Sequence, residues 1–223
     1  MSSSVRCVVL DIDDTLYLER DYAASGFSAV AAHLDCPDFS AAACAALERG
    51  VRGNIFDIVL AELQLDPGPG GVRSLVRVYR EHRPDINLLD DARNCIENWS
   101  ERGQLAVITD GPLASQRAKA EALALTQWCS PIVFTAELGK DCGKPNPAAY
   151  LKVEEVLGLA PHQCAYVADN PKKDFVTPQR RGWTTVRVRR PRSLHEALPS
   201  GPDVQWELPS LVELPPDLQA ILP

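Results

Sequence analysis

The chain lacks any long hydrophobic run and any surplus of basic residues. No stretch approaches the roughly 20 apolar residues that a membrane helix needs, so we expect no transmembrane segment. Lysine and arginine number 23 against 30 acidic residues, which gives a net charge of −7. This balance argues against a nucleic-acid binder that works by neutralising phosphates, and we expect neither nucleic acid nor membrane as a partner.

Paired-cysteine motifs are also missing. The seven cysteines are odd in number and include no C-x-x-C pair, so neither a disulfide framework nor a zinc cluster is indicated. The amino terminus reaches Asp11 after an apolar run too short for a signal peptide. We therefore expect reduced thiols and a cytoplasmic location.

What the chain does contain is typical of a globular protein. Apolar residues make up 45% and charged residues 24% of 223 positions, a composition that excludes an intrinsically disordered chain. The length fits one domain of ordinary size, or one core that carries an inserted lobe.

Short, β-branched apolar runs alternate with helical patterns over most of the chain. The predicted strands cover 5–10, 104–110, 131–136, 163–169 and 184–188. The predicted helices cover about 90–102, 113–125, 147–158 and 171–181. Buried strands that alternate with helices predict an α/β fold, a Rossmann-like parallel sheet covered on both faces.

Residues 17–88 break this alternation, because they show only helical periodicities. Apolar residues recur at helical spacing around 27–34, 55–63 and 72–79. We therefore predict an all-helical insert at 17–88 within a core formed by 1–16 and 89–223. The proline-rich stretch 194–223 is expected to wrap the core and to include a short closing helix.

Polar clusters follow the predicted strands at their carboxyl ends. These clusters are DIDDT at 11–15, TDG at 109–111, GKPNP at 143–147 and DNPKKD at 169–174. Open α/β sheets bind their ligands at the carboxyl ends of parallel strands. We expect the four clusters to face one crevice.

The acids in these clusters indicate a metal site. Asp11 and Asp13 are two residues apart, so strand alternation directs both side chains toward the same side, where Asp169 is expected to join them. Carboxylates that crowd a partly desolvated cleft require either a proton or a hard cation among them. Mg²⁺ is the natural candidate, because it uses one or two carboxylates together with phosphate oxygens.

Groups that hold anions are expected opposite the acids. Thr109 offers a hydroxyl, the backbone amides of Asp110 and Gly111 lie at a helix amino terminus, and Lys144 supplies a positive charge. Such a set suits the transfer of a phosphoryl group to a carboxylate.

Taken together, the motifs resemble those of the haloacid dehalogenase-like hydrolases. Asp11, Asp13 and Thr15 match the D-x-D-x-T motif of that family, and Thr109 matches its second motif. Lys144 matches the third motif, and Asp169 and Asp174 match the acidic pair of the fourth. Ala168 replaces the glycine usual before that pair, and the helical insert is similar to the C1-type cap of the phosphatase branch.

The resemblance implies a role for each motif residue. Asp11 is the expected nucleophile, which forms an aspartyl phosphate, and Asp13 is the expected acid and base. Mg²⁺ is expected on the Asp11 carboxylate, the Asp13 backbone carbonyl and Asp169, with Asp174 orienting the site from behind or through water. Thr109, the Asp110 amide and Lys144 are expected to hold the phosphoryl oxygens.

A phosphatase for a small phosphomonoester is therefore the favoured function. A 2-haloacid dehalogenase is disfavoured by Asp13, and a phosphonatase by the absence of lysine from 17–88. A phosphomutase or a catalytically silent module that binds phosphorylated ligands stays open. The motifs do not distinguish a sugar phosphate from a nucleoside monophosphate or phosphoglycolate.

Other basic groups receive simpler interpretations. Arg73, Arg77 and Arg80 lie at helical spacing and are expected on a solvated helix face, although a substrate contact stays open. The run Arg187, Arg189, Arg190 and Arg192 alternates with valines, which is typical of an edge strand whose charges deter aggregation. Lys172 and Lys173 fit an exposed first helical turn, although a contact with the site beside Asp169 stays open.

Overall fold

The computed structural model describes residues 5–212 and Leu218 of the chain. It divides into two compact units, Met1–Glu19 with Asn87–Pro223 and Arg20–Ile86. We call the first the sheet unit and the second the helical unit.

The sheet unit is built on a parallel sheet. Its strands are β1 (Cys7–Leu10), β2 (Gln104–Thr109), β3 (Ile132–Phe134), β4 (Cys164–Ala168), β5 (Thr184–Val188) and β6 (Trp206–Leu208). Within the described residues the order is β3-β2-β1-β4-β5-β6, and every neighbouring pair is parallel. β1 is central, so the chain leaves the sheet at Asp11 between the ends of β2 and β4.

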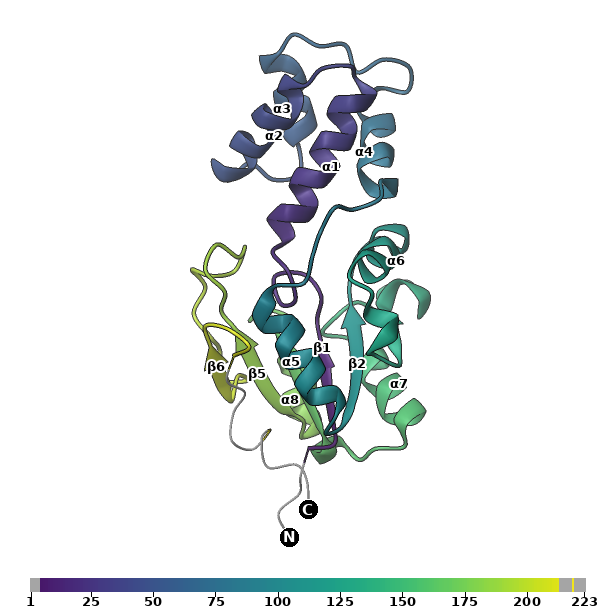
Figure 1. Ribbon diagram of the computed structural model, residues 1–223, viewed down its shortest axis with the longest axis vertical. Coiled ribbons are helices and arrows are strands. Elements are labelled where there is room, and N and C mark those ends of the chain that lie inside the picture. Colours follow the sequence, from purple (N-terminus) through teal and green to yellow (C-terminus); the bar gives the residue numbers. More distant parts are fainter. Residues whose placement is uncertain (1–4, 213–217, 219–223) are drawn as a thin grey trace. The chain divides into compact units, whose positions relative to one another are not determined.

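Helices cover the sheet, which explains why its central strands are continuously apolar. These helices are α5 (Asp90–Ser100), α6 (Leu113–Ala122), α7 (Ala148–Leu157) and α8 (Val176–Arg181). Figure 1 shows the strands side by side with α5 crossing in front of them. Every residue of β1 and β4 is buried, as expected for strands covered on both faces. The predicted Rossmann-like α/β fold is confirmed.

The helical unit contains one helix more than the sequence pattern predicts. Its helices are α1 (Glu19–His33), α2 (Asp38–Glu48), α3 (Ile55–Glu62) and α4 (Gly71–Glu81). The helix missing from the prediction is α2, whose buried side chains are Phe39, Ala43 and Ala46. The repeated alanines of this segment give little contrast between its two faces, so it carries a weak periodic signal.

Two predicted boundaries differ in the sheet unit. The helix expected at 171–181 begins only at Val176, because residues 171–175 form turns held by side chains. There, Asn170 Oδ1 accepts from the Lys172 amide and Asp174 Oδ2 accepts from the Asn170 amide. In the carboxyl-terminal stretch the structure contains β6, which was not predicted. Residues 213–217 and 219–223 of the region expected to hold a closing helix lie outside the described residues.

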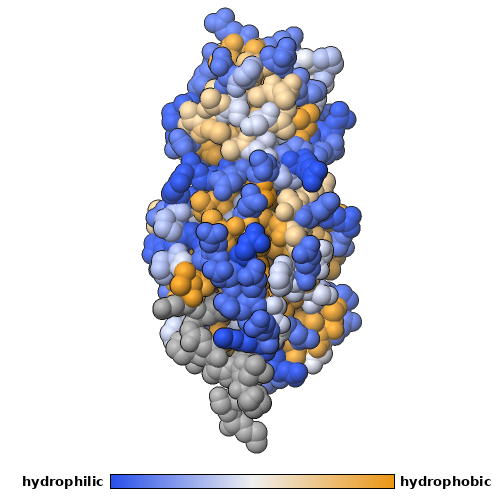
Figure 2. All heavy atoms as spheres, in the orientation of Figure 1, coloured by the Kyte–Doolittle hydropathy of each residue, from blue (hydrophilic) through white to orange (hydrophobic). Residues whose placement is uncertain are grey.

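None of the helices in the described part of the chain has the length and apolar character needed to cross a bilayer. On the face drawn in Figure 2, hydrophobic residues are interspersed among hydrophilic ones. Arg73, Arg77 and Arg80 are exposed on α4, in agreement with a solvated helix face.

Candidate active site

The predicted motif residues lie together in the sheet unit, and most of them are buried. Asp11 follows β1, Thr109 ends β2 and Asp169 follows β4, at the ends of adjacent strands. The loop before α7 adds Lys144. These four residues are 1–6% exposed, so the polar groups lie in a region largely closed to water.

Lys144 lies at the centre of the buried charges. Its side chain is inaccessible to solvent, and its ammonium lies 2.9 Å from Asp11 Oδ1 and 2.9 Å from Asp174 Oδ1. It also donates to the Tyr166 hydroxyl at 2.9 Å. The two acids outweigh burial and hold the pKa of Lys144 above its usual value. Lys144 is therefore a permanent cation directly beside the carboxylate of Asp11.

Three buried acids form a cluster next to this lysine. Carboxylate oxygens of Asp11, Asp169 and Asp174 all lie within 4.8 Å of one another. Burial, together with the charges of Asp11 and Asp174, raises the pKa of Asp169 to about 9. Burial also raises the pKa of Asp11 to about 6, although Lys144 opposes this shift. Without a metal ion, the raised pKa of Asp169 keeps a proton on the cluster at neutral pH.

The Asp13 side chain lies among different partners from those of Asp11. Oδ1 of Asp13 is 2.7 Å from the Lys119 ammonium and accepts a short hydrogen bond from the Tyr17 hydroxyl. Oδ2 accepts from Gln116 Nε2 at 3.0 Å. Burial alone would raise the pKa of Asp13, but Lys119 and these hydrogen bonds outweigh it and hold the pKa below its usual value.

Thr109 and Asp110 use their side chains within the protein. The Thr109 hydroxyl donates to Gln116 Oε1 at 2.9 Å. Asp110 Oδ1 accepts from the Thr135 hydroxyl at 2.8 Å and from the Lys144 amide at 3.1 Å, while Oδ2 lies 2.8 Å from the Lys173 ammonium. The side chain of Asp110 thus ties together the loops that carry the second, third and fourth motifs.

Lys173 is not simply part of an exposed helical turn, because its pair with Asp110 turns it toward the site. Two further polar residues around the site, Gln116 and Lys119, were not predicted. Gln116 and Lys119 are buried on α6, and the sequence carried a signal for them. They lie three residues apart on the helix face that should have been apolar.

Arg187 donates a hydrogen bond to the backbone of the fourth motif, and the prediction that its strand lies at the edge of the sheet is wrong. β5 is not an edge strand, because β6 pairs along its outer side, and Arg187 is completely buried. Its guanidinium donates to the Asp169 carbonyl at 3.0 Å, to the carbonyls of His195 and Leu198, and to the Ser200 hydroxyl. A buried arginine thus fixes the backbone at Asp169.

Arg190 supports the first motif in a similar way. It donates to the Thr15 carbonyl at 2.8 Å and pairs with Asp91 at 2.7 Å.

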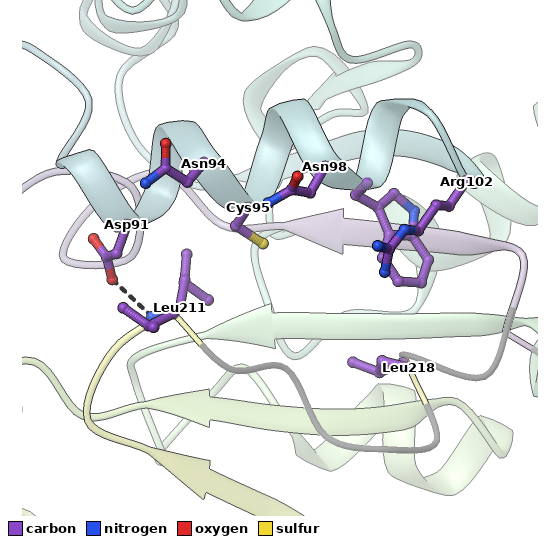
Figure 3. Close-up of a pocket in the computed structure, with 9 residues that line it drawn as sticks. Asp91, Asn94, Cys95, Asn98, Arg102, Leu211 and Leu218 are labelled. Atoms are coloured by element: carbon purple, nitrogen blue, oxygen red, sulfur yellow. Dashed lines mark hydrogen bonds between the residues drawn. The ribbon is translucent and has the colours of Figure 1, made fainter.

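Asp91 also accepts from the Leu211 amide, as Figure 3 shows, at one end of a pocket along α5. The pocket is lined by Asp91, Asn94, Cys95, Asn98, Trp99, Arg102, Leu211, Val212 and Leu218. None of these residues belongs to the acid cluster, so the pocket does not mark the candidate active site.

The charges indicate which group the site can hold. Each of the three lysines pairs with acids: Lys119 with Asp13, Lys144 with Asp11 and Asp174, and Lys173 with Asp110. Asp169 makes no ion pair within the described part of the chain, and its pKa is raised further than that of Asp11. A buried all-oxygen donor set with excess negative charge fits a hard divalent cation such as Mg²⁺.

Known phosphatases are similar to the chain, one over most of its length and another over about half of it. A glyceraldehyde 3-phosphate phosphatase of Methanopyrus kandleri is 26% identical, with 83% of this chain and 84% of that protein covered. A phosphoserine phosphatase of Thermus thermophilus is 30% identical over 55% of this chain and 49% of that protein.

Solved structures share the fold at lower identity. The magnesium-bound HAD-hydrolase YfnB of Bacillus subtilis has a TM-score of 0.70 at 19% identity, with 93% of this chain and 96% of that chain covered. L-2-haloacid dehalogenase of Xanthobacter autotrophicus has a TM-score of 0.64 at 18% identity and covers 98% of this chain and 100% of its own.

The family profile of the haloacid dehalogenase-like hydrolases matches residues 5–176, and a related hydrolase profile matches residues 141–213. The first match spans all four motifs and most of the chain. The chain therefore belongs to the haloacid dehalogenase-like hydrolase family.

Proposed function

We propose that this protein is a magnesium-dependent phosphatase, which hydrolyses a small phosphomonoester through a phosphorylated Asp11. The observation that carries the proposal is the position of Asp11, with its carboxylate 2.9 Å from the Lys144 ammonium and in one cluster with Asp169 and Asp174. Asp11 thus lies between the Lys144 ammonium and a site for a metal ion. Positive charge on both sides favours attack by a carboxylate on a phosphate dianion. The relatives named as phosphatases support the same reaction class.

The residues present fit a magnesium ion. The carboxylates of Asp11 and Asp169 and the backbone carbonyl of Asp13 would hold it, with Asp174 of the same cluster orienting the site from behind or through water. When bound, Mg²⁺ supplies a Lewis acid that offsets negative charge on the phosphoryl oxygens.

In the first proposed step, an oxygen of Asp11 forms a bond to phosphorus while the bond to the leaving alcohol breaks. The departing oxygen takes its proton from the protonated form of Asp13, which is a minor form near neutral pH because Lys119 and the hydrogen bonds hold the pKa of Asp13 low. Lys144 neutralises charge shared between Asp11 and the phosphoryl group. The amide of Asp110 holds one non-bridging oxygen, and the hydroxyl of Thr109 holds another once it exchanges its hydrogen bond to Gln116 for one to the phosphoryl group.

In the second proposed step, water attacks phosphorus and the bond between phosphorus and Asp11 breaks. Asp13, now a carboxylate, takes the proton from the attacking water. Inorganic phosphate leaves and Asp11 is restored. We propose that the insert at 17–88 acts as a cap that selects the leaving alcohol, which makes it the source of substrate specificity.

A panel of phosphomonoesters tests the proposed function. Purified protein is assayed for phosphate release from sugar phosphates, nucleoside monophosphates, phosphoglycolate and p-nitrophenyl phosphate, with Mg²⁺ and with EDTA. We expect release that depends on Mg²⁺ and a preferred substrate class, ranked by kcat/KM. Binding of these compounds without turnover at any pH tested would favour a catalytically silent module instead.

Magnesium affinity is predicted to depend on pH. Because the pKa of Asp169 is raised to about 9 and that of Asp11 to about 6, the metal-free cluster holds at least one proton at neutral pH. Mg²⁺ must displace this proton, so its affinity rises with pH, by about tenfold per unit between about pH 7 and about pH 8.5. Isothermal titration calorimetry in two buffers of different ionisation enthalpy measures both the affinity and the released proton.

The variant Asp169→Asn serves as the control for this measurement, because it removes the group that titrates. It should bind Mg²⁺ weakly, with a flatter pH dependence than wild type. An affinity in the wild-type protein that does not change over this range, with no proton released, would contradict the predicted protonation of the cluster.

A further inference from the structure

Side chains of the protein donate hydrogen bonds to most of the acceptor sites of the Asp13 carboxylate. A carboxylate offers about four lone-pair sites, two on each oxygen. Oδ1 accepts from both Lys119, at 2.7 Å, and Tyr17, whereas Gln116, at 3.0 Å, is the one donor to Oδ2 among the residues that the structure describes. One acceptor site therefore stays open, and it lies on Oδ2. The contacts select which oxygen of Asp13 can exchange a proton.

Gln116 connects Asp13 to the second motif. Its Oε1 accepts from the Thr109 hydroxyl at 2.9 Å, while its Nε2 donates to Asp13. Gly111 leaves space for this amide, because a Cβ atom at that position would lie 2.8 Å from Gln116 Nε2. The φ of Gly111 is +136°, which side chains rarely adopt, so the position suits glycine on both counts. The loop after β2 is thus built around the Gln116 side chain.

Lys119 is an unusual residue for a buried helix face. Its side chain is only 4% exposed, and a buried ammonium is costly unless an acid neutralises it. A purely structural ion pair would explain the contact between Lys119 and Asp13. A structural ion pair alone would not explain why the partner of Lys119 is Asp13, the second aspartate of the first motif. Nor would it explain why hydrogen bonds orient both oxygens of Asp13.

We propose that Lys119 and Gln116 are positioning residues, which orient Asp13 so that Oδ2 takes the proton from the water that attacks phosphorylated Asp11. This inference rests on the proposed phosphatase function. Neither residue contacts the reacting atoms in this account. Their effect passes through Asp13.

The test separates the two chemical steps with p-nitrophenyl phosphate. Its leaving group departs without a proton, so formation of the phosphoenzyme needs little help from Asp13, whereas its hydrolysis needs the base. In a two-step reaction kcat/KM reports the first step, and kcat falls when the second becomes slow. For Lys119→Met and Gln116→Leu we expect kcat to fall by about 10- to 100-fold while kcat/KM changes by less than about threefold.

Arg117→Met is the matched control. Arg117 is another cation on α6, but it pairs with Glu137 at the surface and its side chain is 61% exposed. This variant should keep the kcat and kcat/KM of wild type. Acid-quenched Lys119→Met should also retain more phosphoenzyme at steady state than wild type, which a loss of folded protein cannot produce.

The outcomes distinguish the inference from the proposed function. A wild-type protein that releases no phosphate with Mg²⁺ overturns the proposed function and the inference with it. An active wild type whose Lys119→Met and Gln116→Leu variants lose kcat and kcat/KM equally, or lose neither, overturns the inference alone. Should Lys119→Met fail to fold, judged by circular dichroism, the Gln116→Leu result decides by the same criterion.

Discussion

Replacing Asp11 with asparagine is expected to abolish turnover, with a loss of at least about 10⁴-fold in kcat. The substitution keeps the size of the side chain but removes the anionic oxygen that attacks phosphorus. Lys144 keeps Asp174 as an ionic partner at 2.9 Å, so the variant should remain folded. Phosphate release measured with Mg²⁺, together with circular dichroism, checks the prediction.

Asp90→Asn is the matched control for this variant. Asp90 is an exposed acid in the first turn of α5 and belongs to no part of the candidate site, so its substitution should leave kcat unchanged. If a folded Asp11→Asn protein retained substantial activity, Asp11 would not be the nucleophile, and the mechanism would need another attacking group.

Lys144→Met is expected to give the second-largest effect, a loss of about 10²- to 10³-fold in kcat/KM. The substitution removes a fully buried cation and leaves the carboxylates of Asp11 and Asp174 without their shared partner. The pKa of Asp11, already raised to about 6, should rise further, because Lys144 lowers it more than the other nearby cation, Lys173, does. The acidic limb of the pH–rate profile should therefore move to higher pH.

Magnesium binding distinguishes this effect from a general collapse of the site. Lys144 repels a divalent cation, so at high pH the Lys144→Met variant should bind Mg²⁺ at least as tightly as wild type. Lys140→Met, which alters an exposed lysine of the same loop, should behave like wild type. Loss of Mg²⁺ affinity in a folded Lys144→Met protein would contradict a role limited to charge on Asp11 and the phosphoryl group.

The strands and the four motifs could be predicted because their signals are local. A buried parallel strand is a continuous apolar run, and the polar residues that follow it must lie at the carboxyl edge of the sheet. Asp11, Thr109 and Asp169 were predicted at the ends of strands in one sheet, and in the structure they lie at the ends of the adjacent strands β1, β2 and β4. The helical character of residues 17–88 was likewise predicted from their periodicity.

Predictions were wrong or incomplete where contacts between residues far apart in the sequence determine the structure. The three-residue strand β6 carries no pattern of its own, yet its pairing with β5 buries Arg187 and makes it a support for the Asp169 backbone. Asp110 shows a similar limit: its amide was predicted to bind phosphate, but nothing local indicates that its side chain would pair with Lys173.

Lys119 and Gln116 illustrate a signal that was present but ambiguous. A polar residue on a predicted helix most often faces solvent, and only the position of α6 beside β2 and Asp13 shows that these two are buried. The partner of Lys119 is 106 positions away in sequence. A polar stripe on the face that ought to cover a sheet is thus a useful indication of a site.

The most direct test of the central claim is detection of the phosphorylated aspartate itself. The Asp13→Asn variant, in which hydrolysis of the intermediate should be slow, is mixed with p-nitrophenyl phosphate and Mg²⁺, quenched in acid and analysed by peptide fragmentation. The account predicts a phosphoryl group on Asp11 that hydroxylamine removes and that Asp11→Asn prevents. Phosphate release by the wild-type protein, with no phosphoryl group on Asp11 in this variant, would contradict it.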